Sequence, residues 1–138
     1  MPHAPVLQWP DFVGPIIGAL IFCAIMSRIA EPQRRTLNAV LVTGAGGVYM
    51  SGGFGGWELA YALIAGPVVG YLALRSYYAI GIGWLMHATW DWLHHLYGGA
   101  IWPFMPTSSF GCMIFDTCIA VWFLAGAPPH ASPAVQAV

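Results

Sequence analysis

Four polar residues that lie close together in the chain, His87, Asp91, His94 and His95, have the spacing of ligands on one face of a helix. Counted from His87 they stand at i, i+4, i+7 and i+8, and at about 100° per residue these positions share an arc of roughly 100°. Imidazole and carboxylate groups together suit zinc, iron, copper or manganese. The pattern therefore predicts a site that binds a transition metal or transfers protons.

The chain around these residues is too apolar for a soluble protein. Of its 138 residues, 59% are hydrophobic and 7% are charged, whereas a soluble domain carries about 25% charged residues. The net charge is −1 and there is no lysine, so the basic patch that nucleic-acid binding needs is absent. The composition predicts an integral membrane protein, in which ionisable side chains inside a span are costly and indicate function.

Turn-forming residues divide the chain into five apolar segments. We expect helices over residues 12–30, 37–50, 57–74, 77–97 and 109–125. The predicted fold class is therefore all-α, a polytopic membrane bundle of about five transmembrane helices. Residues 1–126 form a single domain in this interpretation, and residues 127–138 form a disordered Pro/Ala-rich tail. Residues 37–56 are short of a full span and rich in glycine, so they fit either a complete span or a re-entrant piece.

The arginines set the expected orientation of the bundle. Arg28, Arg34 and Arg35 flank the first connection, and Arg75 lies in the third. With five spans these two connections lie on the same side, which the positive-inside rule assigns to the cytoplasm. The N-terminus is then outside and the C-terminus is cytoplasmic.

Topology also predicts the depth of each polar residue. Asp91 lies about 9 Å below the outer end of its helix, and Asp116 about 10 Å below the start of the next helix, at 1.5 Å per residue. His87 lies about 15 Å deep, near the middle of the membrane, on the same rise. Glu58 begins the third helix near the level of His95. We therefore expect three helices to bring acids to the histidine face in the outer half of the bilayer.

These residues have assignable chemical roles. We expect metal ligands among five residues, namely His87, Asp91, His94, His95 and Asp116. Asp91, Asp116 and Glu58 are the expected catalytic acids, bases or additional ligands, and there are enough donors for a second ion. Zinc or iron is the expected cofactor. Trp84 lies on the histidine side of its helix, where it either walls a pocket for a substrate or pigment or simply packs.

Each polar residue also has a purely structural explanation. His94 and His95 lie near the outer interface and would be solvated there. Asp91 and Asp116 would accept hydrogen bonds between helices, and Glu58 would be a favourable acid in the first turn of a helix. His87 would be a neutral, hydrogen-bonded imidazole. These readings stay open at the level of the sequence.

Several stretches resemble a known family. They are Gly53-Phe-Gly-Gly-Trp-Glu-Leu59, Ile82-Gly-Trp-Leu-Met-His-Ala-Thr-Trp-Asp91, His94-His-Leu-Tyr-Gly98 and Pro103-Phe-Met-Pro-Thr-Ser-Ser109, followed by Gly111-Cys112 and Asp116. The chain resembles a family of small bacterial integral membrane proteins of unknown function. The resemblance implies location in a bacterial inner membrane and implies no activity.

Three hypotheses about function follow. The first is a membrane-embedded enzyme, metal-dependent or acid–base, that acts on a lipid or isoprenoid from the outer leaflet. The second is a small transporter for protons or metal ions. The third is an accessory subunit of a membrane complex that binds a pigment or haem. The sequence leaves open whether the chain forms a homo-oligomer or joins a larger complex.

Overall fold

The computed structural model describes residues 5–49 and 53–128, and all the regular elements in this part of the chain are helices. In chain order they are α1 (Trp9–Met26), α2 (Gln33–Ala45), α3 (Gly56–Ala60), the π-helical turn η1 (Tyr61–Ala65), α4 (Gly66–Ala73), α5 (Tyr77–Tyr97) and α6 (Ser108–Leu124). Because α3, η1 and α4 follow one another without a break, the elements form five rods. The all-α prediction is confirmed for the described residues.

The predicted helix bounds agree with the structure to within one residue in the last three segments, whereas the first segment, predicted over 12–30, is helical over Trp9–Met26. The 77–97 prediction coincides with α5, and 109–125 differs from α6 by one residue at each end. The segment predicted over 37–50 is instead helical over Gln33–Ala45, and residues 46–49 form turns. Apart from Ala127 and Pro128, the predicted tail lies outside the described residues.

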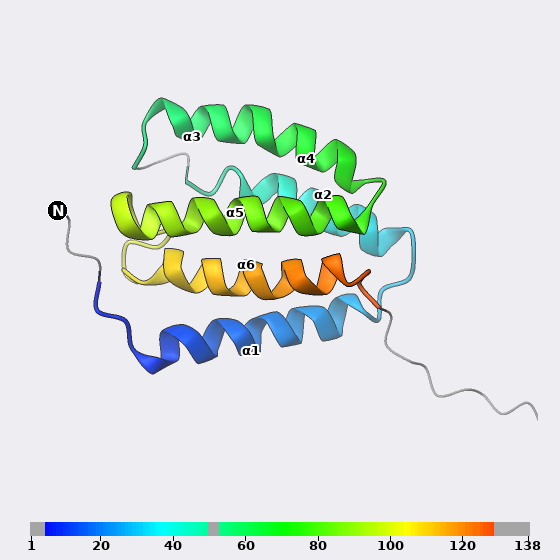
Figure 1. Ribbon diagram of the computed structural model, residues 1–138, viewed down its shortest axis with the longest axis horizontal. Coiled ribbons are helices and arrows are strands. Elements are labelled where there is room, and N and C mark those ends of the chain that lie inside the picture. Colours follow the sequence, from blue (N-terminus) through cyan, green and yellow to red (C-terminus); the bar gives the residue numbers. More distant parts are fainter. Residues whose placement is uncertain (1–4, 50–52, 129–138) are drawn as a thin grey trace, which may run out of the picture.

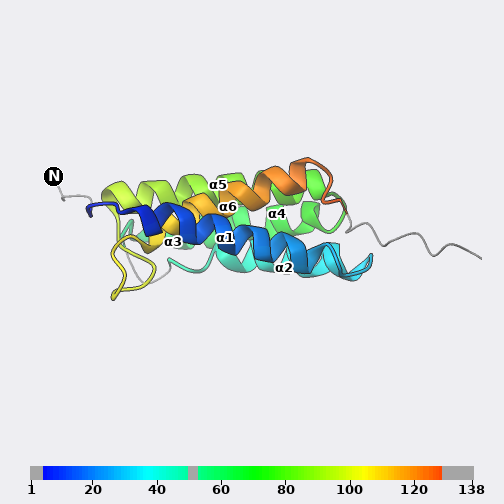
Figure 2. The ribbon, with the colours of Figure 1, turned by 90° about the horizontal axis from the view of Figure 1, so that it is seen from below.

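The rods lie side by side along the long direction of the molecule, with α5 near the centre (Figure 1). α5 packs against α6 on one side and against α4 and α2 on the other, and α6 separates α5 from α1. Figure 2 shows that α2 lies on the opposite side of the molecule from α5, out of the plane of its neighbours. α5 therefore packs against three other rods, and its residues face several partners.

The connections alternate between the two ends of the bundle. The α1–α2 and α4–α5 connections lie at one end, and the α2–α3 and α5–α6 connections lie at the other (Figure 1). The four basic residues of the chain all fall in or beside the first pair of connections; they are Arg28, Arg34, Arg35 and Arg75. One end of the bundle is therefore basic, and the described part of the other end has no basic side chain except histidine.

Polar groups lie inside the bundle while apolar side chains cover much of its outside. Asn38, Asp91, His94 and Ser109 are among the most buried side chains. Large apolar residues such as Leu20, Ile64 and Val121 are instead well exposed. Two helices, Trp9–Met26 and Gly56–Ala73, are long and apolar enough to cross a membrane.

Pro67 explains the π-helical turn in the third rod. A proline inside a helix lacks the N–H that would bond four residues back, and its ring crowds the carbonyl there. The turn Tyr61–Ala65 lies immediately before this position, where a widened turn relieves the conflict. It carries Tyr61, whose ring stacks on Trp90 of α5 with centroids 4.8 Å apart. The irregular turn therefore packs against the central helix.

Candidate metal centre

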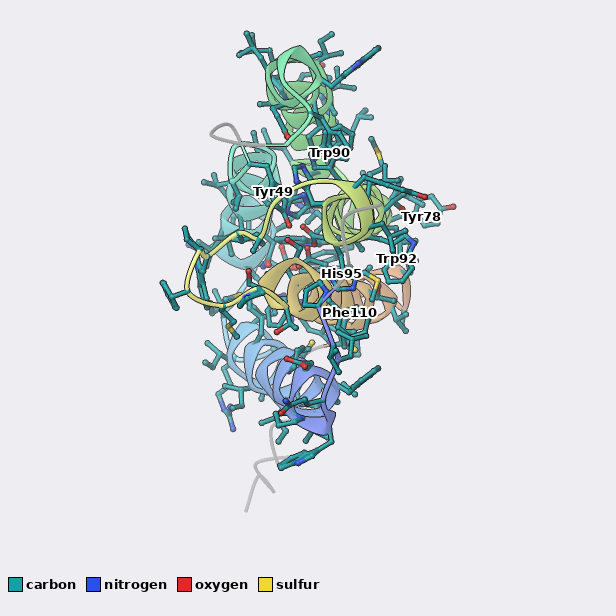
Figure 3. The ribbon with its side chains drawn as sticks, turned by 90° about the vertical axis from the view of Figure 1, so that its left-hand side faces the viewer. Tyr49, Tyr78, Trp90, Trp92, His95 and Phe110 are labelled. Carbon is teal, nitrogen blue, oxygen red and sulfur yellow. The ribbon has the colours of Figure 1, made fainter. Side chains whose placement is uncertain are left out.

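Helix α5 directs its polar face into the bundle. The exposed fraction is 0% for Asp91, 1% for His94 and 4% for His87. Figure 3, which looks along the bundle, shows Tyr49 and Trp90 on one side of α5 and His95 and Phe110 on the side of α6. Side-chain oxygen atoms gather between these helices in the same view. The polar face predicted for this helix is therefore an internal face.

His87, Asp91 and Asp116 form a buried group that could hold a metal ion. Their candidate ligand atoms all lie within 4.8 Å of one another. His87 Nε2 lies 3.8 Å from Asp91 Oδ1 and 3.9 Å from Asp116 Oδ2. Two helices supply this group, because Asp116 comes from α6 and the other two residues come from α5.

The distances in this cluster suit an ion better than direct hydrogen bonds. Separations of 3.8 and 3.9 Å exceed the range of a hydrogen bond between nitrogen and oxygen. Ligand bonds of about 2.1 Å at tetrahedral angles put two donor atoms about 3.4 Å apart, so each of the two separations from His87 would have to shorten by about half an ångström around zinc. His87 Nδ1 and Asp91 Oδ2 are buried without a hydrogen-bond partner. The donor set therefore fits a metal and leaves polar atoms for it or its water to satisfy.

Charge balance gives a second argument for a cation. Asp91 and Asp116 are both buried, and two buried carboxylates are costly unless a proton or a cation neutralises them. None of the four arginines lies near them, since all four are at the opposite end of the bundle. Among the described residues, the charge of the two carboxylates would be balanced by a protonated histidine, by a proton on one carboxyl group or by a bound cation.

Tyr49 completes the immediate surroundings of the cluster. Its hydroxyl donates a 2.8 Å hydrogen bond to Asp91 Oδ1. The residue follows the end of α2 on irregular backbone and is 4% exposed. A hydroxyl that holds a ligand carboxylate in one orientation is the usual kind of outer partner in a metal site.

Glu58 and His94 form a separate pair beside the cluster. His94 Nε2 lies 3.0 Å from Glu58 Oε1. The same carboxylate accepts hydrogen bonds from the Phe54 backbone N–H at 3.0 Å and from Trp90 Nε1 at 3.3 Å. Because a carboxylate only accepts, we assign a proton to His94 Nε2. In the neutral imidazole Nδ1 is then an acceptor, and it is buried without a partner.

Close packing fixes the ring of His94. Tyr49 stacks on it with centroids 3.6 Å apart and planes 12° from parallel. A Cβ added at Gly53 would come within 2.9 Å of the ring, and one at Gly98 within 2.6 Å of Nδ1. Both positions must therefore stay glycine for the ring to remain where it is. Tyr49 contacts both polar groups, through its ring here and through its hydroxyl at Asp91.

A family comparison covers nearly all of this structure. The model of DUF6010, a family of unknown function, matches residues 10–129. The chain belongs to the DUF6010 family. The matched range includes every candidate site residue, and the expected membership of a family of unknown function is confirmed. No curated protein and no solved structure matches the chain.

Not all of the predicted ligands meet in this DUF6010 protein. His94 is paired with Glu58, and His95 turns toward α6, where its ring centroid lies 5.2 Å from that of Phe110 (Figure 3). The ring of Trp92, on α5 itself, lies 5.6 Å from that of His95. Among the described residues, the group within ligand distance contains only His87 of the three histidines. The predicted arc of roughly 100° is wide enough that its two edges face different helices. The structure thus divides one predicted site into a cluster, a pair and a separate histidine.

Trp84 lies in the apolar core of this DUF6010 protein, one turn from the cluster. Its ring centroid is 6.2 Å from that of His87, and its Nε1 is buried without a hydrogen-bond partner. It packs in the core with Ile80, Ile119 and Phe123. A role for Trp84 in binding a cofactor remains a prediction.

Sequence reasoning missed Tyr49, Gly53 and Gly98, although each touches the site. Tyr49 precedes a glycine-rich stretch, and a lone tyrosine there has no spacing that would mark it. Gly53 has a φ of +105°, which requires glycine, but this backbone angle is visible only in the structure. The two glycines were part of the stretches that resemble the family, yet nothing in those stretches indicated that they pack on His94.

Proposed function

We propose that the chain is a polytopic membrane protein of five spans with its basic end in the cytoplasm. The apolar exterior, the polar interior and the grouping of the arginines support this arrangement. Helix α5, with 21 residues, is about 31 Å long and matches the hydrocarbon core of a bilayer. The N-terminus is then outside the cell membrane, and the proposed location is a bacterial inner membrane.

The second span is broken in this proposal. Helix α2 has 13 residues and is about 20 Å long, which is too short to cross alone. Irregular backbone at membrane depth is tolerated only where protein or a polar cavity covers it. Residues 46–49 satisfy this condition at Tyr49, which is buried against Asp91 and His94. The break thus delivers a hydrogen-bond donor to the candidate site.

We propose further that the His87–Asp91–Asp116 cluster binds a transition metal, zinc or iron, and that the protein is an enzyme. The observation that carries this proposal is the convergence of three buried ligand atoms from two helices, with neighbouring polar atoms left unpartnered. Three protein ligands leave a coordination position open, which is typical of catalytic sites. A metal held there supplies Lewis acidity and an activated water.

The chain's own residues supply positioning and proton transfer. Tyr49 holds Asp91 through its 2.8 Å hydrogen bond, and Glu58 orients His94 through a 3.0 Å contact. His94 Nδ1 is then placed to accept a proton, with Glu58 stabilising the imidazolium that forms. Because the site lies in the outer half of an apolar bundle, the proposed substrate is a membrane lipid or isoprenoid.

The Glu58–His94 contact also favours a metal-free alternative. A histidine oriented by a carboxylate is a general base in many enzymes without any metal. In that case Asp91 and Asp116 would share a proton, with Tyr49 donating to the ionised partner. This second candidate keeps the acid–base role of His94 and removes the metal.

The proposal is tested by lipid conversion in vesicles. Purified protein is reconstituted with phospholipids and isoprenoid alcohols, supplied with zinc or ferrous iron, and the lipids are analysed by mass spectrometry. Wild type and His95→Ala are expected to convert a lipid, and Asp116→Asn is expected not to. Conversion that is equal in Asp116→Asn, or absent in metal-loaded wild type, would contradict the proposal.

A further inference from the structure

A cavity with one polar end lies beside the candidate metal centre. It has a volume of about 420 Å³ and lies between α1, α6 and the loop that precedes α6. Its lining includes Gly14, Pro15 and Phe115 at membrane depth and Asp11, Thr107 and Ser108 toward the end of the bundle. Sites of this size hold drug-sized ligands. The cavity is thus apolar along most of its length and polar at one end.

The polar end of the cavity is built for an uncharged group. Asp11 accepts hydrogen bonds of 2.7 Å from the Thr107 hydroxyl and from the Gln8 backbone N–H. The arginines lie at the opposite end of the bundle, and the basic side chain that interacts with Asp11 is the buried His95, so a phosphate or carboxylate would meet a negative charge with at most one histidine to offset it. The charge of Asp11 therefore selects against anionic lipids.

Ser108 provides a donor for an oxygen on the ligand. Its side chain is buried, and its Oγ accepts a 3.1 Å hydrogen bond from the Trp102 backbone N–H. A hydroxyl has one proton to donate, and this one remains available for a ligand that enters the cavity. A hydroxyl or carbonyl oxygen is the acceptor that fits beside a carboxylate.

The cavity and the metal cluster share a wall. Cys112 lines the cavity and lies four residues before Asp116, so the two side chains occupy adjacent turns on one side of α6. A ligand whose polar end rests at Ser108 would extend its chain past Gly14 and Phe115, alongside Cys112. The chain of the ligand would then lie next to the helix face that carries Asp116.

We propose that this cavity binds a neutral single-chain amphiphile, with a hydroxyl or carbonyl head at Asp11 and Ser108 and its hydrocarbon chain along Gly14, Cys112 and Phe115. Its role as the substrate of the candidate metal centre rests on the proposed function. Binding itself does not, because the cavity is lined by residues other than the three ligands. The two claims therefore fail separately.

The first test compares a neutral ligand with its anionic counterpart. Native mass spectrometry follows the titration of detergent-purified full-length protein with geranylgeraniol or with geranylgeranyl diphosphate. One saturable molecule of the alcohol is expected, with the diphosphate binding about tenfold more weakly or not at all. Absence of saturable binding of the alcohol, or equal binding of the two ligands, would overturn the proposal.

A pair of glycine variants localises the site. Gly14 and Gly44 are both exposed helical glycines with no atom within 4 Å of an added Cβ, and only Gly14 lines this cavity. Gly14→Phe is expected to weaken binding of geranylgeraniol by about tenfold or more by filling the space. Gly44 lines a separate hollow, so Gly44→Phe should bind geranylgeraniol as wild type does. Equal binding by the two variants would place the alcohol elsewhere.

A measurement on wild type covers the case in which Gly14→Phe fails to fold. Cys23, Cys112 and Cys118 are all free thiols, and only Cys112 lines the cavity. Saturating geranylgeraniol is expected to slow the reaction of Cys112 with N-ethylmaleimide, measured by peptide mass spectrometry, with Cys23 and Cys118 unchanged. Unaltered labelling of Cys112 would contradict the proposal.

Metal analysis of the same preparations separates the two claims. Gly14→Phe should keep the metal content of wild type while losing the alcohol, and His87→Ala should lose metal while still binding the alcohol. Wild type that binds geranylgeraniol but takes up no metal after exposure to zinc and ferrous iron would refute the metal centre alone. Wild type that holds metal but does not bind geranylgeraniol would refute the cavity assignment alone.

Discussion

At the scale of single residues, Tyr49 connects two polar groups that lie on different turns of α5. Its hydroxyl binds Asp91 and its ring stacks on His94. Removal of the hydroxyl keeps the ring that stacks on His94 but removes the hydrogen bond that holds the Asp91 carboxylate in one orientation. A variant of Tyr49 therefore tests how the orientation of Asp91 affects metal binding, while Asp91 itself is still present.

We predict that Tyr49→Phe retains a bound metal with lower affinity. Loss of a hydrogen bond to a ligand carboxylate weakens metal binding by about tenfold to a hundredfold. The affinity is measured by competition with a chelator in detergent. The matched control is Tyr61→Phe, because the Tyr61 ring stacks on Trp90 while its hydroxyl forms no hydrogen bond among the described residues. Affinities that fall equally in both variants would argue against the role of Tyr49.

A second prediction at this scale concerns the packing of His94. Gly98→Ala would place a Cβ 2.6 Å from His94 Nδ1, whereas Gly99→Ala meets nothing within 4 Å. We expect Gly98→Ala to lower the free energy of unfolding by about 1–3 kcal/mol, and Gly99→Ala to stay within about 0.5 kcal/mol of wild type. Unfolding in mixed micelles provides the comparison. Similar stabilities for the two variants would show that His94 moves freely.

The sequence predicted which residues belong to the candidate site better than it predicted which of them contact one another. The spacing of His87 and Asp91 on one face, and the depth of Asp116, indicated the cluster because both follow from helix geometry. The pairing of Glu58 with His94 depends on irregular backbone around Gly53, which no periodicity describes. His95 lies at the edge of the predicted arc, so its direction was set by packing against Phe110.

At the scale of the helices, α5 is the element on which the arrangement depends. Gly83 lies where α2, α4 and α5 meet, and a Cβ there would lie 2.4 Å from Val69 Cγ1 and 2.9 Å from Val42 Cγ2. Valine side chains are stiff at χ1, so these neighbours cannot turn away. Small residues allow such close approach of helices in membranes.

We therefore expect Gly83→Ala to destabilise the bundle by about 1–3 kcal/mol through overpacking. Gly44→Ala is the control, since an added Cβ at Gly44 meets nothing within 4 Å. Both are helical glycines, so the gain in helix propensity is shared and the difference reports the contact. Unfolding midpoints in mixed micelles that coincide for the two variants would contradict the close contact of these three helices.

The helices themselves were predictable to the extent that their ends are marked. Ser76 and Gly98 bound α5, and the predicted and observed ranges coincide. The second segment was misplaced because glycines at 44, 46 and 47 permit both helix and turn, and the choice depends on where Tyr49 packs. The π-helical turn was not predicted, because residues 57–74 read as one apolar helix that contains Pro67.

At the scale of the whole molecule, the ends of the bundle differ in charge and in chemistry. The arginines lie at one end, and the candidate centre extends from the middle of α5 and α6 toward the other end, where Asp91 lies. The positive-inside rule assigns the basic end of such a bundle to the cytoplasm. The proposed orientation places the candidate centre in the outer half of the membrane.

Thiol labelling tests that orientation. In a background with Cys23, Cys112 and Cys118 replaced by alanine, we expect Phe104→Cys to react with a membrane-impermeant maleimide in intact cells. Ala30→Cys should react only after the membrane is permeabilised. Both positions are exposed and lie in connections at opposite ends of the bundle. The reverse pattern would show the opposite topology. Labelling of both variants in intact cells would contradict a membrane-spanning bundle.

The most direct test of the central claim is the metal content of the purified protein, measured by inductively coupled plasma mass spectrometry with an affinity tag that lacks histidine. The account predicts about one equivalent of zinc or iron in wild type, as expected for three protein ligands around one ion. His87→Ala and Asp91→Asn should lose it, while His95→Ala, which lies outside the cluster, should keep it. Folded wild type without metal after exposure to both ions, or metal retained in His87→Ala and Asp91→Asn, would contradict the metal centre.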